Sequence, residues 1–145
     1  MTEASLQRIA ANYELLASRM YTLTQLFYQR LFEALPQVRP LFRIDIDLQS
    51  QHLAAALALI VRNLRLLDVL EQPLMELGAD HTRAGVRPQH YPIVCQIMVQ
   101  TLRDASGQSW SDQLQCDWDD ALLRISQIMI AGGQRARTMQ IGDRG

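Results

Sequence analysis

Apolar residues recur at helical spacing in nearly every segment between one proline or glycine and the next, and this periodicity limits the fold more than any other feature. Steps of three and four residues keep side chains on one face of a helix. Residues 2–16 carry such a stripe, and residues 18–34 repeat it up to the stop at Pro36. No long segment shows the alternation of a strand. The sequence therefore predicts an all-α domain of six to eight helices with short connections.

The middle of the chain reads as two further helices. One is expected over residues 48–65, with Asp47 as its N-cap. The next is expected over residues 67–82, where Pro73 is either a first-turn residue or a break. Gly85 suits the end of this second helix because glycine accepts the left-handed backbone conformation found there.

The C-terminal third is expected to hold two helices and a tail. Pro88 opens a helix that runs to about Arg103, and Ser109 resembles the N-cap of a long last helix that ends near Ile130. Residues 132–145 are expected to be a frayed tail. With no repeat and no linker, the 145 residues are expected to form one domain.

Composition and charge exclude several classes of protein. A net charge of −1 argues against general nucleic-acid binding, which needs clustered basic residues. Cys95 and Cys116 form no CxxC pair and no covalent haem-attachment motif. The apolar run at 53–61 is far shorter than a membrane span, and the N-terminus has no signal-peptide core, so a cytoplasmic location is expected.

His81 is the histidine whose position suggests chemistry. It continues a stripe formed by Leu70, Leu74 and Leu77, so it is expected to point into the core with these leucines. A buried imidazole must satisfy both nitrogens or bind something, and the pattern leaves both possibilities open. One inward histidine suits a cofactor that supplies most of its own coordination, as haem does.

The other two histidines are weaker candidates. His90 falls in the first turn of the next helix and is expected to be half-exposed. His52 lies on the flank of the stripe from Gln49 to Ile60, where an exposed and a pocket-facing orientation both remain open. No motif of a zinc hydrolase, a serine hydrolase or a phosphate-binding loop is found.

Four segments together resemble the globins, in particular the bacterial single-domain type related to the globin half of flavohaemoglobins. They are LFYQRLFEALPQVRPLF (26–42), LQSQHLAAALALIVRNL (48–64), MELGADHTRAGVRPQHYPIV (75–94) and SDQLQCDWDDALL (111–123). Their order and spacing match the family over nearly the whole chain. The resemblance implies a globin fold around non-covalent haem b.

The resemblance also implies roles for individual residues. His81 corresponds to the proximal iron ligand, Phe42 to the aromatic residue that stacks on the haem, and Tyr28 to the tyrosine that faces the distal side. Gln49 corresponds to the distal residue nearest the bound gas and Leu53 to the apolar residue one turn later. The haem-pocket positions expected on the proximal side are Leu77, Val86, Tyr91 and Val94.

Two parts of this assignment depend on helix phase. Either Phe27 or Tyr28 faces the pocket, and a shifted corner would place Gln51 or His52 above the iron in place of Gln49. Gln49 is favoured because it continues the stripe through Leu53. His52 would otherwise bind a haem propionate or compete for the iron.

The implied function is reversible binding of O2, NO or CO at ferrous haem, with Tyr28 and Gln49 as hydrogen-bond donors. The alternatives are an NO dioxygenase that works with a separate reductase and a globin-fold sensor; whether the protein is an enzyme, and its oligomeric state, stay open. The chain departs from the flavohaemoglobin pattern because no reductase domain is expected after Gly145. In addition, Gly132, Gly133 and Arg135 occupy the region of a last-helix glutamate.

Overall fold

Helices form almost all of the chain in the computed structural model, which describes the backbone of residues 1–144 and the side chains of residues 1–139. The α-helices are Glu3–Leu16 (α1), Met20–Ala34 (α2), Ile46–Arg62 (α3), Leu67–Ala84 (α4), His90–Ser106 (α5) and Asp112–Arg144 (α6). Short 3-10 helices connect them at Ala17–Arg19 (η1), Pro36–Leu41 (η2), Leu64–Leu66 (η3) and Gly107–Ser109 (η4). The described residues contain no strand, and the predicted all-α class is confirmed.

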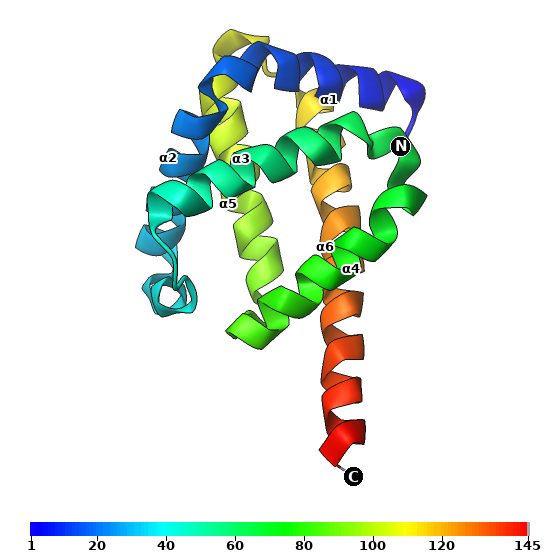
Figure 1. Ribbon diagram of the computed structural model, residues 1–145. Helices are drawn as coiled ribbons and strands as arrows, with labels where there is room; N and C mark the ends of the chain where they lie inside the picture. The colour runs from blue at the N-terminus through cyan, green and yellow to red at the C-terminus, as the bar shows by residue number, and fades with distance from the viewer. Residues whose placement is uncertain (145) are drawn as a thin grey trace.

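α6 is the element that ties the molecule together. It packs most extensively against α4, and it also contacts α5 and α1, while α2 packs against α3 and α5. Figure 1 shows α1 and α3 crossing the upper part of the molecule and the C-terminal part of α6 extending below the other helices. The helices that carry the candidate residues, α2, α3, α4 and α5, are therefore held by one long helix and by each other.

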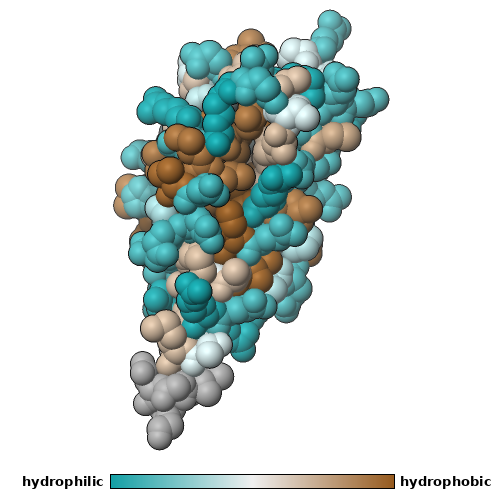
Figure 2. Space-filling view, turned by 90° about the vertical axis from the view of Figure 1, so that its right-hand side faces the viewer, coloured by the Kyte–Doolittle hydropathy of each residue, from teal (hydrophilic) through white to brown (hydrophobic). Residues whose placement is uncertain are grey.

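The core lies where α1, α2, α5 and α6 meet. Its most deeply buried apolar side chains are Ile9, Leu16 and Leu102, each at most 1% exposed. Burying a side chain of this size stabilises the folded state by about 1.5–3 kcal/mol. Figure 2 shows that apolar side chains also gather in a patch on one face of the surface, bordered by polar ones.

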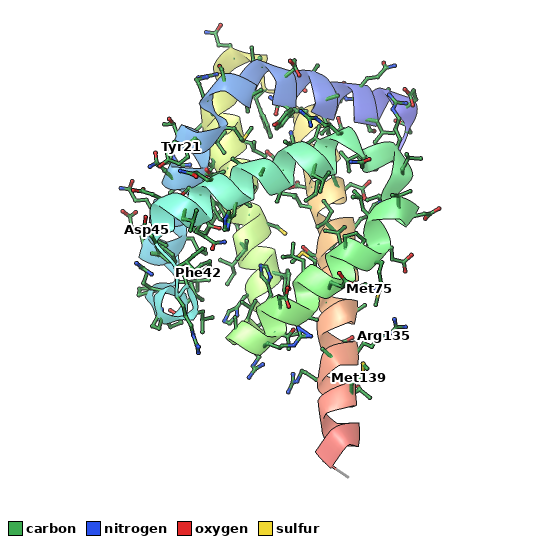
Figure 3. All side chains as sticks on the ribbon, viewed as in Figure 1. Tyr21, Phe42, Asp45, Met75, Arg135 and Met139 are labelled. Carbon is green, nitrogen blue, oxygen red and sulfur yellow. The ribbon has the colours of Figure 1, made fainter. Side chains whose placement is uncertain are left out.

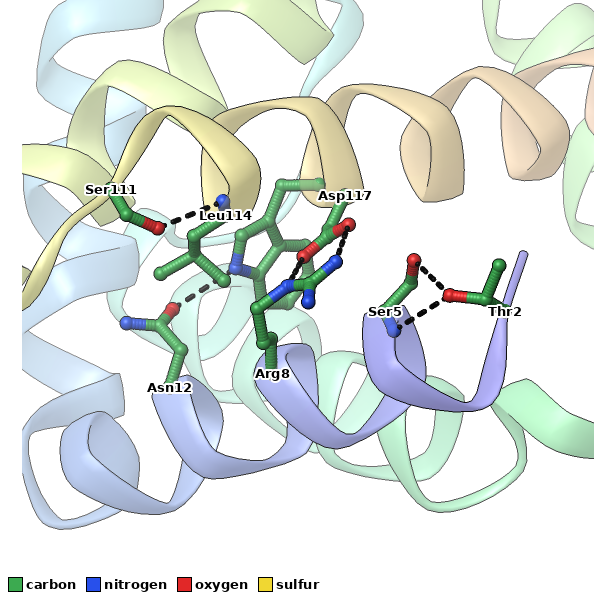
Figure 4. Close-up of polar contacts among 8 residues, drawn as sticks. Thr2, Ser5, Arg8, Asn12, Ser111, Leu114 and Asp117 are labelled. Carbon is green, nitrogen blue, oxygen red and sulfur yellow. Dashed lines mark hydrogen bonds and ion pairs between the residues drawn. The ribbon is translucent and has the colours of Figure 1, made fainter.

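A polar network joins α1 to α5 and α6 inside this core (Figure 4). The Trp118 Nε1–H donates to Asn12 Oδ1 at 3.0 Å, and Asn12 Nδ2 donates to Ser106 Oγ at 2.8 Å. Beside it, the Arg8 guanidinium binds both carboxylate oxygens of Asp117, at 2.6 and 3.1 Å. Each of these buried groups has a partner, which removes the cost of burying it.

Two of the predicted helix caps are wrong. α3 begins at Ile46, so Asp45 takes the N-cap position and Asp47 lies in the first turn. α6 begins at Asp112, and Ser111 caps it by accepting from the Leu114 N–H at 3.1 Å. Ser109 donates instead to a carbonyl of the preceding helix. In both cases a neighbouring residue of equal capping ability lies nearer the true first turn.

α4 continues through Pro73, where a break was one of two possibilities, and α6 continues past its predicted end. Pro73 lies inside α4 and does not break it, because packing of α4 on α6 offsets the roughly 3 kcal/mol cost of an interior proline. α6 continues past the predicted end near Ile130 to Arg144, so the expected tail is helical over its described part. Gly132 and Gly133 are buried in the contact with α4 and do not end the helix.

Candidate functional site

His81 lies in the last turn of α4 with one ring nitrogen already committed. Its Nδ1 is 2.8 Å from the backbone carbonyl oxygen of Leu77, one turn earlier in the same helix. A carbonyl oxygen only accepts, so Nδ1 carries the proton and Nε2 keeps its lone pair. Burial lowers the pKa of His81 below its ordinary value, so the ring is neutral at pH 7. This is the state in which an imidazole binds a metal ion.

The end of α4 is fixed directly beyond His81. Gly85 has a φ of 111°, the left-handed conformation predicted for this helix end, and the Val86 N–H donates to the His81 carbonyl at 2.9 Å. Leu41 of η2 packs against Gly85, where a Cβ would lie 2.9 Å from one of its methyl groups. The backbone on either side of the histidine is thus held in place.

Leu77 does not follow the leucine stripe into the core. Leu70 and Leu74 are 5% and 4% exposed, whereas Leu77 is 36% exposed. The prediction that all three leucines point into the core is therefore wrong at Leu77. Steps of four and three residues keep Leu77 within about 20° of Leu70 around the helix, so its exposure comes from how neighbouring segments pack near the end of α4 and not from helix phase. Val86, just beyond the end of α4, and Val94 of α5 are half-buried and pack against the core.

An aromatic cluster forms where α2 meets the corner before α3. The Tyr28 ring contacts Phe42 edge-on at a centroid distance of 5.5 Å and stacks on Phe32 at 5.9 Å. Phe32 and Phe42 also meet edge-on, at 5.3 Å. Figure 3 shows Phe42 projecting from this corner, apart from Met75 on α4. Tyr28 therefore faces the corner, while Phe27 packs against its ring edge in the core.

Gln49 is the polar residue of α3 that accompanies Tyr28. Burial raises the pKa of the Tyr28 hydroxyl, and hydrogen bonding with the Gln49 side chain opposes that shift. The register of α3 against α2 is set nearby, because Thr24 Oγ1 donates to the Ser50 carbonyl at 2.9 Å. Leu53, one turn after Gln49, is half-buried, whereas His52 on the same helix is exposed.

Tyr91 of α5 is a buried residue with an unsatisfied hydroxyl. The residue is 9% exposed, and its hydroxyl oxygen has no hydrogen-bond partner among the described residues. Burial raises its pKa, so the hydroxyl stays protonated. Gly132 and Gly133, which occupy the region of the missing glutamate, are too tightly packed against α4 to carry a side chain that could reach this hydroxyl.

His90 has a structural role that the sequence analysis missed. Its Nδ1 accepts the backbone N–H of Arg87 at 3.0 Å, which closes the turn between α4 and α5. The spacing of three residues across a Pro-containing turn was visible in the sequence, but side-chain capping by histidine is too rare to be predicted from it. The two histidines therefore differ. His90 Nδ1 accepts a backbone N–H, whereas His81 Nδ1 donates to a backbone carbonyl.

Surface features add little to this site. A groove of about 620 Å³ between α5 and α6 is lined by Tyr91 and Cys95, and one of about 820 Å³ lies between α4 and α6. Neither groove is lined by His81, Tyr28 or Gln49. Among the described residues no cluster of three metal-binding side chains occurs, and no helix is long and apolar enough to cross a membrane.

The globin family model matches residues 25–129 of the chain. A flavohemoprotein of Rhizobium meliloti (strain 1021) is 26% identical over 132 residues, covering 89% of this chain and 33% of the relative. A flavohemoprotein of Bordetella pertussis is 32% identical over 117 residues, covering 79% and 29%. The chain thus spans about a third of the length of the flavohemoproteins that it matches. The anaerobic nitrite reductase NSHB5 of Oryza sativa subsp. indica is 31% identical over 101 residues, covering 66% of this chain and 70% of the relative.

Solved structures agree with this match at the level of the fold. A bacterial globin from Campylobacter jejuni superposes with a TM-score of 0.83 at 22% identity, covering 94% of this chain and 99% of that one. A carbene transferase engineered from a proposed nitric oxide dioxygenase of Rhodothermus marinus gives a TM-score of 0.88 at 22% identity, covering 97% and 99%. Both likenesses extend over the helices that carry the candidate site.

Proposed function

Because this chain belongs to the globin family, as its match over residues 25–129 shows, we propose that it binds haem b through His81 and reversibly binds O2 at the haem iron. The observation that carries the proposal is the state of the His81 ring. Nδ1 donates to the Leu77 carbonyl, so Nε2 is left as the metal-binding nitrogen. Haem needs only one such protein ligand, which suits a chain whose described residues form no metal-binding cluster.

The residues on the two sides of the site suit a flat apolar cofactor with one bound gas. Phe42, Leu53, Val86 and Val94 are half-buried apolar side chains from four different segments. They would pack against the porphyrin and keep water from it, and the partly exposed Leu77 would be covered in the same way. Non-covalent binding follows, because no cysteine motif for attachment is present.

Ferrous haem held by one imidazole supplies an open iron position at which O2, NO or CO binds. Tyr28 and Gln49 provide the hydrogen-bond donors of this pocket, and their contact with each other keeps both oriented. Such a hydrogen bond is worth about 1–3 kcal/mol, or roughly tenfold to a hundredfold in retention of the gas. Two donors favour slow release. Exposure of His52 supports Gln49 as the residue nearest the gas.

A second candidate function is oxidation of NO, favoured by the flavohemoprotein relatives and by the Rhodothermus marinus neighbour. NO, O2 and one electron together give nitrate, so each turnover needs an electron from a donor protein. We propose a separate reductase as that donor. Tyr28 and Gln49 would hold O2 in place, and the reaction places no further demand on this chain's side chains.

The proposal is tested by adding haem to the purified apoprotein and recording the absorption spectrum. A Soret band at one haem per chain is expected, and its absence would contradict both functions. His81→Gly is expected to lose the haem and to regain it when free imidazole is added, because imidazole can replace the missing ligand.

Two matched histidine variants serve as controls. His52→Ala and His90→Ala are expected to retain haem, since one residue is exposed and the other caps a turn. Equal haem retention by His81→Gly and the wild type would exclude His81 as the ligand. NO consumption with and without ferredoxin reductase and NADPH then separates gas binding from NO oxidation.

A further inference from the structure

α4 and α6 cross so closely that three glycines line their contact, two of them against the backbone of the other helix. A Cβ added to Gly78 of α4 would overlap the carbonyl group of Met129, and a Cβ added to Gly132 of α6 would overlap that of Met75. These two contacts are with backbone atoms, which cannot rotate out of the way. They set the distance between the two helix axes, and this pair of helices has the most extensive contact in the molecule.

Gly133 makes a different contact from Gly78 and Gly132. A Cβ added there would overlap the side-chain oxygen of Thr82 and lie 3.2 Å from the Thr82 Cβ and 3.3 Å from the Gly78 carbonyl oxygen. Thr82 directly follows His81 in the chain. The contact therefore falls on the last turn of α4, the turn that holds the histidine and its hydrogen bond to Leu77.

We propose that Gly133 is a positioning residue for His81: the absence of a side chain at this position lets the last turn of α4 lie against α6, and this contact sets where the imidazole is held. The effect on haem binding rests on the proposed function, whereas the contact between Gly133 and Thr82 does not. Rotation of the Thr82 side chain can relieve the overlap with its oxygen, but the contacts of a Cβ at residue 133 with the Thr82 Cβ at 3.2 Å and the Gly78 carbonyl oxygen at 3.3 Å remain, and they displace the last turn of α4 by a few tenths of an ångström. His81 moves with Thr82, because both belong to one hydrogen-bonded helical turn that ends at Gly85.

The test compares Gly133→Ala with Gly132→Ala, the same substitution one residue earlier on the same helix. Both are expected to lower the midpoint of thermal unfolding. Only Gly133→Ala is expected to change the ring ¹⁵N chemical shifts of His81 in the apoprotein, which report the Nδ1 hydrogen bond. With haem bound, it is expected to shift the iron–histidine stretching band and to speed haem loss about tenfold, the factor that corresponds to 1.4 kcal/mol.

A second substitution separates positioning from damage to the fold. In Gly133→Ala with Thr82→Ala the overlapping oxygen is removed, so the His81 chemical shifts and the haem-loss rate are expected to return toward wild-type values. Such strong non-additivity is typical of residues in direct contact. If Gly133→Ala fails to fold, Thr82→Val replaces the hydroxyl at this contact by a bulkier methyl group and is expected to move the same signals by a smaller amount.

Two outcomes would overturn the inference. One is a loss of stability in Gly133→Ala or Thr82→Val with unchanged His81 signals, and the other is the same change of these signals in Gly132→Ala. A wild-type protein that binds no haem would contradict the proposed function only. The apoprotein chemical shifts would still decide whether Gly133 positions His81.

Discussion

Polar groups are paired at the α1 end of the molecule and are less fully paired on the side that we propose to bind haem, here called the haem side. At the α1 end, where α1 crosses α5 and α6, Asn12, Ser106 and Trp118 are buried and all are hydrogen-bonded. On the haem side, between α3, α4 and α5, Tyr91 has a buried hydroxyl without a partner. His81 Nε2 likewise has no hydrogen bond among the residues described.

We interpret the paired groups at the α1 end as stabilising the fold, and the unpaired groups on the haem side as available to a ligand. A buried polar group without a partner costs about 1–3 kcal/mol, so a protein keeps few of them. Those it keeps tend to lie at functional sites, where local rules of stability are broken. Substitutions on one side at a time show whether the properties of the other side change.

The largest effect is expected from removing the donors next to the gas. Tyr28→Phe and Gln49→Leu should each speed O2 release by roughly tenfold to a hundredfold, because each removes a hydrogen bond of about 1–3 kcal/mol. Stopped-flow measurement of O2 release from the ferrous haem protein checks this. Gln51→Leu, at an exposed position of the same helix, is the control and should change little. Unchanged release in both variants would mean that neither residue contacts the gas.

At the α1 end, Trp118→Phe should lower the free energy of unfolding by about 1–3 kcal/mol and leave haem affinity unchanged. The substitution keeps an aromatic ring but leaves the Asn12 oxygen without its donor in the core. Trp110→Phe is the matched control, because Trp110 also donates a hydrogen bond, to Gln115, but is only half-buried. Chemical denaturation measures both. A large change in haem affinity would show that the two sides are coupled.

On the haem side, Tyr91→Phe should not lower the free energy of unfolding as Trp118→Phe does. Because the Tyr91 hydroxyl is buried without a partner, its removal is expected to leave the stability of the apoprotein unchanged or to raise it by about 1 kcal/mol. The Tyr28 hydroxyl lies beside the Gln49 side chain, which opposes the rise of its pKa, so we expect Tyr28→Phe to destabilise the apoprotein instead. A clear loss of stability in Tyr91→Phe would mean that its hydroxyl is satisfied in solution, and the contrast would then fail.

The smallest effect is a pH dependence at the α1 end. Hydrogen bonding to Arg8 lowers the pKa of Asp117 below its ordinary value of 3.8. The unfolded chain therefore binds this proton more readily than the folded one. The stabilisation is fully present above pH 3.8 and is lost as the pH falls through the lower folded-state pKa.

Asp117→Asn should accordingly flatten the loss of stability in acid, measured as the free energy of unfolding between pH 5 and pH 2.5. Asp120→Asn is the control, because Asp120 pairs with Arg124 on the surface of the same helix, where ion pairs contribute little. If the free energy of unfolding depends on pH equally in Asp117→Asn and the wild type, the Arg8–Asp117 pair does not stabilise the fold.

Helix positions could be predicted from the sequence wherever apolar spacing and a stop signal agreed. The end of α4 at Gly85 is such a case, because the left-handed conformation needed there favours glycine. Gly132 and Gly133 misled the prediction because a glycine pair reads as a helix end. Their actual role depends on α4, which lies some fifty residues earlier in the chain.

The site was only partly predictable for the same reason. The hydrogen bond from His81 to the Leu77 carbonyl follows from local geometry, because Leu77 lies one turn earlier in the same helix. The exposure of Leu77 and the unsatisfied hydroxyl of Tyr91 depend on how separate helices meet. No pattern within one helix contains that information.

The unbroken course of α6 has a mechanical consequence. Trp118, at the α1 end, and Gly133, beside His81, lie 15 residues apart on one helix, which is about 22 Å at 1.5 Å per residue. Over that length a rigid rod that tilts by about 3° at one end moves by about 1 Å at the other, and displacements of that size change metal–ligand bonds and site geometry. A substitution near Trp118 that tilts α6 would therefore displace Gly133, whereas Trp118→Phe, which keeps an aromatic ring in place, is expected to leave the tilt of α6 unchanged.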